Sequence, residues 1–477
     1  MDNFKRRSFL CAAGTFAGAN LMATTCSRRE KHAVPAAFNR NRSTYEKIVQ
    51  CVQDTPFIDT HEHFWEESLR IRSARGEDAG VSIPAPDFGI LFTHYADSDL
   101  HVSGMPRENY DKLLSRDVPV KEKWSLIAPW YERCRHTGYL QCLRETLRIL
   151  FEEEDLRKDN AEHISRLLKE NITPGFYKRL LRDVANIEYA HVNCLQSLVF
   201  RETEQPELLG VDLSINTLFR PPDLDSLKNL LGRPVTTLDE ARQAIDTCFT
   251  RYAPRAIAVK TQCAYFRPLN FPETPADDAA PLFARFASGE TLTDEEVNLL
   301  QGHLFHYCMD KAAEHKLFVK LHTGYFAGSD GMPLGWVRDN AADLCPIIKA
   351  HPDTNFVLFH IGYPYQEEPI ALAKHYSNVY VDMCWAWILS PVASVRFLKE
   401  FLAAAPACKL FTFGGDYLPI EMSIGHASMA RRGIAQAVTE MVLEGWLEEE
   451  DVPSLVERIM NGNARECFDR ERATRGV

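Results

Sequence analysis

The chain has 477 residues, of which 45% are hydrophobic and 25% are charged, as in an ordinary globular protein. Its formal net charge of -12 argues against a surface for nucleic acid or for an anionic membrane. No apolar run is long enough to predict a transmembrane span, so the partner that we expect is a small-molecule substrate.

Residues 1–35 are expected to form an export segment. A basic start with Arg6 and Arg7 leads into Ser-Phe-Leu and a weakly hydrophobic stretch, which resembles a twin-arginine signal. The sequence therefore predicts export to the periplasm, with a disordered tail as the alternative. A lipid anchor on Cys26 is the weaker reading, because the preceding Ala-Thr-Thr matches a lipoprotein cleavage site poorly.

The first predicted strand, residues 56–64, carries the pair His61 and His63 in PFIDTHEHF. Residues i and i+2 of a strand point to the same face, so both imidazoles can bind one metal ion. Taken alone, the pair fits two solvent-facing histidines on a loop equally well. Residues 65–186 follow, and much of this stretch has a helical pattern. We expect it to be a helical insertion that stands over one face of the fold.

The rest of the chain alternates apolar strand patterns with helical patterns. Continuous apolar runs are typical of parallel strands that are covered on both faces. Eight strands with intervening helices predict a distorted TIM-type (β/α)8 barrel of the α/β class, within residues 36–477. Residues 263–303, between the fourth strand and its helix, are a candidate lid loop. The other predicted strands are 187–194, 208–219, 256–262, 317–324, 355–363, 379–385 and 410–416, and the predicted helices are 237–252, 303–315, 341–351, 391–405 and 429–446.

Three later strands also end in residues that suit a metal site: His322, His360 and Asp416. The carboxyl ends of all barrel strands meet at one mouth. Together with His61 and His63, these side chains predict a metal centre there. The remaining histidines are expected to be surface or packing residues. The cysteines of the strand-like runs, Cys263 and Cys384, are expected to be small buried hydrophobic residues.

The motifs IDTHEHF, VKLHTGY, NFVLFHIGYPY, FTFGGD and NGNARECF resemble the amidohydrolase superfamily, specifically its amidohydrolase-related branch. AVKTQCAYFRPL and GGDYLPIE are more narrowly similar to the amidohydrolase domains of nodulin and glutamate-ammonia-ligase-like proteins. Uronate isomerases are more distant relatives. The resemblance covers 56–64 and most of 187–470, and it leaves the middle of the insertion unexplained.

The resemblance implies a role for each residue of the predicted metal centre. His61, His63 and His322 would bind the metal, and Asp416 would contact the metal or its water and act as the general base. His360 would bind a second metal or polarise the substrate's carbonyl group. Zn²⁺ suits this nitrogen-rich ligand set, with Mn²⁺, Fe²⁺ or Co²⁺ as alternatives, and the branch favours one ion over two.

Lys260, in the fourth strand, has three open interpretations. It could be a carbamylated bridge between two metals, a ligand for a substrate carboxylate, or a structural residue. Substrate binding is favoured, because the branch usually carries one metal. Tyr265, Arg267 and Arg220 are further candidates for substrate binding, since an arginine suits a carboxylate or a phosphate.

These residues predict a metal-dependent hydrolase that attacks an amide, lactone or ester-like bond of a small polar substrate. The alternative on the same barrel is a decarboxylase or a uronate-type isomerase, whose substrate would be carboxylated or sugar-like. A binding protein without catalysis is the third reading. A homo-oligomer is compatible with the sequence.

Overall fold

The structure is a computed structural model, and it describes residue 38 and residues 41–195, 199–220 and 222–468. All of these fall in one unit of the chain, Val34–Val477. The predicted export segment and Cys26 lie outside the described residues. Within the described ranges, no helix is both long and apolar enough to cross a membrane.

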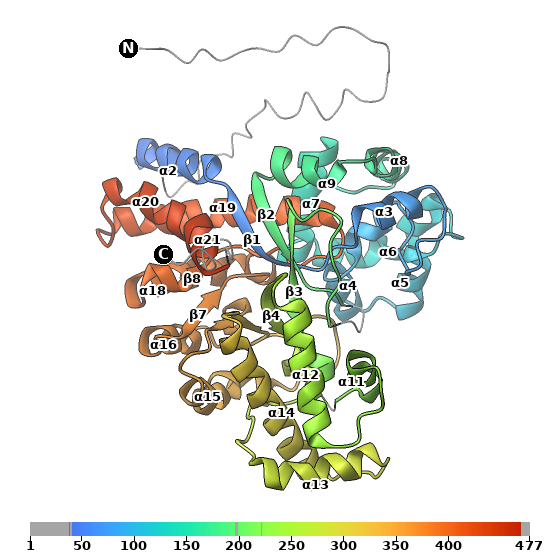
Figure 1. The fold of residues 1–477 in the computed structure, drawn as a ribbon. Helices are drawn as coiled ribbons and strands as arrows, with labels where there is room; N and C mark the ends of the chain where they lie inside the picture. Colours follow the sequence, from blue (N-terminus) through green and yellow to red (C-terminus); the bar gives the residue numbers. More distant parts are fainter. Residues whose placement is uncertain (1–37, 39–40, 196–198, 221, 469–477) are drawn as a thin grey trace, which may run out of the picture. The chain divides into compact units, whose positions relative to one another are not determined.

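Eight strands form one sheet whose order follows the sequence (Figure 1), and every neighbouring pair is parallel. The predicted barrel class is thus confirmed, and each strand lies inside its predicted range. The strands are β1 (Phe57–Glu62), β2 (Ile187–Val192), β3 (Leu209–Ser214), β4 (Ala256–Thr261), β5 (Val319–Leu321), β6 (Phe356–Leu358), β7 (Val379–Asp382) and β8 (Leu410–Phe411).

Backbone hydrogen bonds between β1 and the segment after β8 close the barrel. Thr60 N donates to Phe413 O at 3.0 Å, and Asp416 N donates to His61 O at 2.8 Å. Register shifts within β1 and β3 account for the distortion that the sequence predicted. The closure places the residues that follow β8 directly beside the end of β1.

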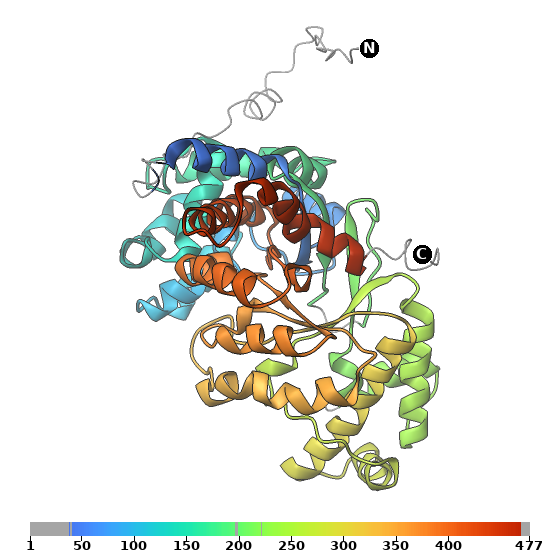
Figure 2. The same cartoon turned by 90° about the vertical axis from the view of Figure 1, so that its left-hand side faces the viewer.

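Helices cover the outside of the sheet, as Figure 2 shows from the side. The described part of the β2–β3 connection contains no helix, so the alternation is not complete. The helices from β3 onward are α10 (Asn216–Phe219), α11 (Leu224–Leu231), α12 (Leu238–Tyr252), η4 (Cys263–Tyr265), α13 (Ala276–Ala287), α14 (Asp294–Glu314), α15 (Leu334–Ala350), η5 (His360–Gly362), α16 (Glu367–His375), α17 (Ala386–Leu389), α18 (Pro391–Ala404), η6 (Ala407–Lys409), α19 (Ile420–Leu443), η7 (Glu449–Asp451), α20 (Val452–Glu457), η8 (Arg458–Gly462) and α21 (Asn463–Phe468).

The segment between β1 and β2 is largely helical, as its sequence pattern predicted. Its helix α7 packs against α19 of the barrel, and α2 (Arg42–Asp54), which precedes β1, packs against the same helix. The insertion helices are α3 (Glu67–Ala74), η2 (Phe88–Phe92), α4 (Ala96–Val102), α5 (Arg107–Leu114), α6 (Val120–Cys134), α7 (Gly138–Phe151), α8 (Ala161–Asn171), α9 (Phe176–Lys178) and η3 (Arg179–Val184).

The candidate lid, residues 263–303, is more ordered than a loop. It contains α13, and α14 already begins at Asp294 rather than at His303. Thr293 accepts a hydrogen bond from Glu296 N while the Glu296 side chain accepts one from Thr293 N, a capping box that starts the helix. The later helix start expected from the sequence is therefore wrong, because it followed the apolar pattern and overlooked this cap.

Candidate metal centre

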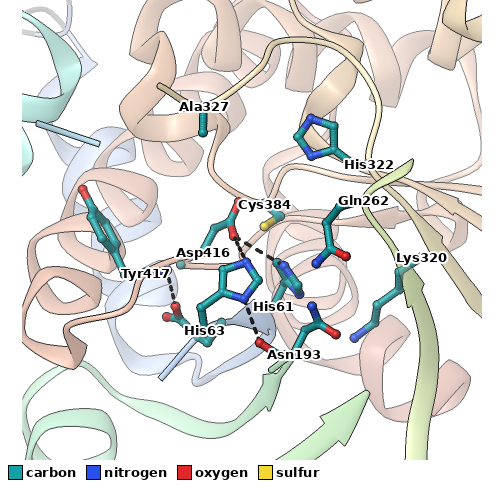
Figure 3. Close-up of polar contacts among 12 residues, drawn as sticks. His61, His63, Asn193, Gln262, Lys320, His322, Ala327, Cys384, Asp416 and Tyr417 are labelled. Atoms are coloured by element: carbon teal, nitrogen blue, oxygen red, sulfur yellow. Dashed lines mark hydrogen bonds and ion pairs between the residues drawn. The ribbon is translucent and has the colours of Figure 1, made fainter. Parts of the chain in front are cut away.

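The barrel brings the five predicted metal-site side chains to the carboxyl ends of four strands. His61 and His63 stand at the end of β1, and His322, His360 and Asp416 follow β5, β6 and β8. All five are buried, none more than 7% exposed. Figure 3 shows His61 and His63 pointing toward the Asp416 carboxylate.

The carboxylate of Asp416 lies between two groups of histidine nitrogens. Its Oδ1 is 3.4 Å from His61 Nε2 and 3.1 Å from His63 Nε2. Its Oδ2 faces the other way and is 3.9 Å from His360 Nε2. One carboxylate oxygen thus contacts the histidines of β1, and the other faces His360 after β6.

Unusual backbone conformations aim several of these side chains. His360 and Asp416 have φ of 64° and 61°, in the left-handed region that residues other than glycine rarely adopt. His94, in the insertion, has φ of 86°. Such conformations cost free energy and cluster at functional sites, which agrees with a site at this mouth.

The two glycines before Asp416 allow the close approach of β1 and β7. A Cβ atom on Gly415 would lie 1.9 Å from Glu62 Oε1, and one on Gly414 would lie 2.8 Å from Cys384 Sγ. Any larger residue would collide with these groups. The Gly-Gly-Asp motif therefore places Asp416 against both neighbouring strands.

Hydrogen bonds fix which nitrogen faces the site in three of the rings, those of His63, His322 and His360. His63 Nδ1 lies 2.7 Å from the carbonyl oxygen of Asn193. A carbonyl can only accept, so Nδ1 carries the proton and, in a neutral ring, Nε2 presents a lone pair. That lone pair points at a carboxylate oxygen, an arrangement that a cation between them would stabilise.

His360 and His322 repeat this pattern. His360 Nδ1 lies 2.9 Å from Cys384 O, and His322 Nε2 lies 3.0 Å from Tyr325 O. Both outer nitrogens therefore donate to carbonyls. The inner nitrogens, His360 Nε2 and His322 Nδ1, are 2.9 Å apart, so in neutral rings two lone pairs face each other. A shared proton or a metal ion relieves that repulsion.

Burial keeps the rings of His61, His322 and His360 neutral. It lowers the pKa of His61 and of His322 well below the ordinary value, and that of His360 to about 4. Burial acts to raise the pKa of Asp416, whereas positive charge on the adjacent His61 or His63 acts to lower it. Neutral imidazoles and an ionised carboxylate are the forms in which these side chains bind metal.

This donor set fits a divalent ion. His61, His63 and Asp416 each offer one ligand atom within 4.8 Å of the others, and so do His360, Cys384 and Asp416. Nitrogen and carboxylate donors suit Zn²⁺ and its first-row neighbours. His322 reaches the centre through His360, so its role as a direct ligand stays a prediction.

Lys260 also lies inside this mouth, fully buried. Its Nζ has no hydrogen-bond partner among the described residues and sits 3.7 Å from the centroid of the Phe359 ring. Burial lowers its pKa to about 8, against the attraction of Asp416. An unpaired buried amine is costly, so its position agrees with a role toward a bound group.

The other predicted substrate residues lie at different places. The Tyr265 ring is 4.3 Å from that of His322, so Tyr265 borders the centre. Arg220 is half-buried and stacks on Phe266. Arg267 donates to Pro268 O, Asn270 O, Asn298 and Gln301, so its guanidinium is engaged in holding the 263–303 segment to α14. Its predicted contact with substrate finds no support in this placement.

Sequence reasoning missed two residues of the insertion that reach the centre. The His94 ring lies 5.3 Å from that of His63, and its Nδ1 is buried without a partner in the described chain. Tyr95 stacks on Trp385, and burial together with the nearby Asp416 carboxylate raises the pKa of its hydroxyl well above the ordinary value. No periodicity or motif marks them, because only the fold of the insertion over the mouth brings them there.

A buried ion pair below the centre was also missed. Lys320 Nζ donates to both oxygens of Asp212 at 2.8 and 3.0 Å, and Asp212 Oδ2 lies 3.7 Å from His61 Nδ1. The carboxylate thus connects β3 and β5 to the ligand on β1, as outer-shell carboxylates do for metal-binding histidines.

Comparison with known proteins agrees with this fold. The model of the amidohydrolase family matches residues 241–470. Protein fluG of Emericella nidulans is 34% identical over 103 residues, which are 21% of this chain and 11% of that protein. The chain therefore spans only a small part of that curated relative.

Solved structures are similar over most of the chain. Uronate isomerase of Thermotoga maritima has a TM-score of 0.72 at 17% identity, over 89% of this chain and 97% of the isomerase. Glucuronate isomerase of Caulobacter crescentus also has a TM-score of 0.72, at 18% identity. The match covers 94% of this chain and 98% of that isomerase. A metal-dependent hydrolase of Lactobacillus casei has 0.61, at 15% identity, over 89% and 98%.

Residues 241–470 thus match the amidohydrolase family, whose members are metal-dependent enzymes. Over most of its length the chain shares its fold with the uronate isomerases.

Proposed function

We propose that this protein is a metal-dependent hydrolase that cleaves an amide, lactone or ester-like bond of a small polar substrate. The observation that carries the proposal is the convergence of the His61, His63 and His360 nitrogens on the Asp416 carboxylate in a buried mouth. We further propose one resident divalent ion, Zn²⁺ before Mn²⁺, Fe²⁺ or Co²⁺, held by His61, His63 and Asp416.

When bound, a divalent ion would supply Lewis acidity and lower the pKa of a water to about 7. Asp416 takes the proton of the attacking water and passes it to the leaving group. Tyr95, whose hydroxyl pKa is raised by burial and by Asp416, stays protonated and can donate to this carboxylate. Lys260, charged and unpaired in the described chain, binds a carboxylate or a carbonyl oxygen of the substrate.

Isotope incorporation from solvent tests the proposal. The protein is incubated in H₂¹⁸O with panels of lactones, N-acyl compounds and simple esters, with and without added Zn²⁺. Hydrolysis predicts one solvent oxygen in the acid product, and turnover that is lower by about 10²–10⁴-fold with Asp416→Asn. Turnover that adds no solvent oxygen contradicts hydrolysis.

A second candidate is a uronate-type isomerase, and the similarity to two uronate isomerases over nearly their whole length favours it. In that reaction Asp416 or a histidine moves a proton between two substrate carbons. Isomerisation in D₂O would place deuterium on a carbon atom of the product. A decarboxylase would instead release CO₂.

We also propose that the protein is exported to the periplasm, on the strength of Arg6 and Arg7 alone. Replacement of both by lysine should leave the protein in the cytoplasmic fraction. A periplasmic product from that variant would contradict the proposal.

A further inference from the structure

The β7 end of the metal centre carries a thiol that the mechanism above does not use. Cys384 follows β7 by two residues and is fully buried. One ligand atom each of Cys384, His360 and Asp416 lies within 4.8 Å of the other two. Figure 3 shows the Cys384 sulfur beside the Asp416 carboxylate.

We propose that Cys384, His360 and Asp416 form a second half-site, which holds a thiophilic divalent ion such as Zn²⁺ or Co²⁺. This inference rests on the metal-dependent function proposed above. It departs from the single ion expected from the sequence, and it makes the centre a pair of half-sites that share one carboxylate.

The two oxygens of Asp416 are placed for such sharing. Oδ1 faces His61 and His63, while Oδ2 faces His360. A carboxylate that bridges two ions presents one oxygen to each. The second half-site would then consist of Asp416 Oδ2, an imidazole nitrogen of His360 and the Cys384 sulfur.

The chain leaves space for the sulfur to point into the mouth. Gly414 has no Cβ, and one added there would lie 2.8 Å from Cys384 Sγ and 3.0 Å from Thr60 Oγ1. The backbone carbonyl of Cys384 accepts from His360 Nδ1 at 2.9 Å. The same residue therefore orients the imidazole and offers a sulfur next to it.

The charges of the described groups also suit this arrangement. Lys260 Nζ, buried and without a hydrogen-bond partner in the described chain, lies close enough to Cys384 and Asp416 for attraction. Binding of the ion replaces the thiol proton, which leaves to solvent. The resulting thiolate and the carboxylate offset the combined charge of the ion and the lysine.

Cobalt substitution of the full chain tests the inference. The protein is stripped with a chelator, reloaded with Co²⁺, and examined for thiolate-to-cobalt absorption in the near ultraviolet and for cobalt content. The wild type should show the band and bind two equivalents. Cys384→Ser and Cys384→Ala should lose the band and one equivalent. The control Cys308→Ser, on α14 and equally buried, should behave as the wild type.

One further measurement needs no variant. X-ray absorption at the zinc edge of the wild type should detect sulfur at about 2.3 Å, which tests the inference even if the Cys384 variants fail to fold. Cobalt bound without a thiolate band, or a band that survives in both Cys384 variants, overturns the second half-site and leaves the proposed function standing. A chain that binds no metal at all overturns both.

Discussion

At the residue scale, the site depends on Asp416, which touches both groups of donors. Asp416→Asn preserves the shape of the side chain but removes the base and its charge. We expect turnover to fall by about 10²–10⁴-fold, measured as steady-state kcat on the substrate that the isotope panel identifies. A binding protein without catalysis would keep its ligand affinity and have no turnover to lose.

His94 should contribute to turnover without holding the metal. It comes from the insertion, lies beside His63 and has a buried, unpartnered Nδ1 within the described residues. His94→Asn should lower kcat by about 10²-fold, the usual effect of one lost hydrogen-bond donor. His101→Asn, in the same insertion on α4, is the matched control and should leave kcat unchanged. A His94 variant that loses its metal would instead make His94 a ligand.

The sequence was informative at this scale where the side chain follows a barrel strand. His61, His63, His360 and Asp416 could be assigned because strand ends converge in any barrel. Cys384 also follows a strand, but its apolar sequence neighbours predict a buried hydrophobic residue that only fills the core. The role proposed for it depends on the missing Cβ of Gly414 and on the direction of its sulfur, and neither can be derived from a linear pattern.

At the element scale, the insertion is anchored to the barrel by a buried ion pair. Arg70 on α3 donates to both oxygens of Glu421 on α19, at 3.1 and 2.7 Å. Arg70→Met leaves a buried carboxylate without its partner and should lower the free energy of unfolding by about 3–5 kcal/mol, measured by urea titration.

Two controls separate charge from packing at this anchor. The double variant Arg70→Met, Glu421→Met should recover most of the loss, because both charges are removed together. Glu46→Gln, in an exposed pair with Arg42, should change stability by about 1 kcal/mol at most. If the double variant is no more stable than the single one, the loss comes from packing.

Element positions were predictable and element ends were not. The eight strands were found because parallel strands read as continuous apolar runs. The start of α14 was missed because a capping box at Thr293 and Glu296 begins the helix before its apolar face does. The contacts of the insertion were out of reach, since a pair such as Arg70 and Glu421 joins residues far apart in the chain.

At the scale of the whole molecule, buried neutral histidines should make the fold sensitive to acid. Burial lowers the pKa of His426 and of His94 to about 3, and that of His360 to about 4. In the unfolded chain these groups have a pKa of about 6.5. The unfolded state then binds more protons, so stability is lost as the pH falls below about 6.5.

Urea titrations of the metal-free protein between pH 7 and pH 4 measure this loss. Each such histidine should contribute about 1.4 kcal/mol per pH unit. His426→Gln, outside the metal ligands, should make the slope shallower by about that amount, and His375→Gln, which is exposed, should not. If the free energy of unfolding depends on pH equally in the wild type and in His426→Gln, His426 is not held in its neutral form by burial.

The central claim is that this barrel mouth holds a divalent metal. Elemental analysis of the full chain, purified without chelator, tests it most directly when the double variant His61→Asn, His63→Asn is analysed in parallel. We expect at least one tightly bound divalent ion per wild-type chain and its loss from the variant. A wild-type chain that stays metal-free after incubation with Zn²⁺, Mn²⁺, Fe²⁺ or Co²⁺, or a variant that retains as much metal, would contradict the account.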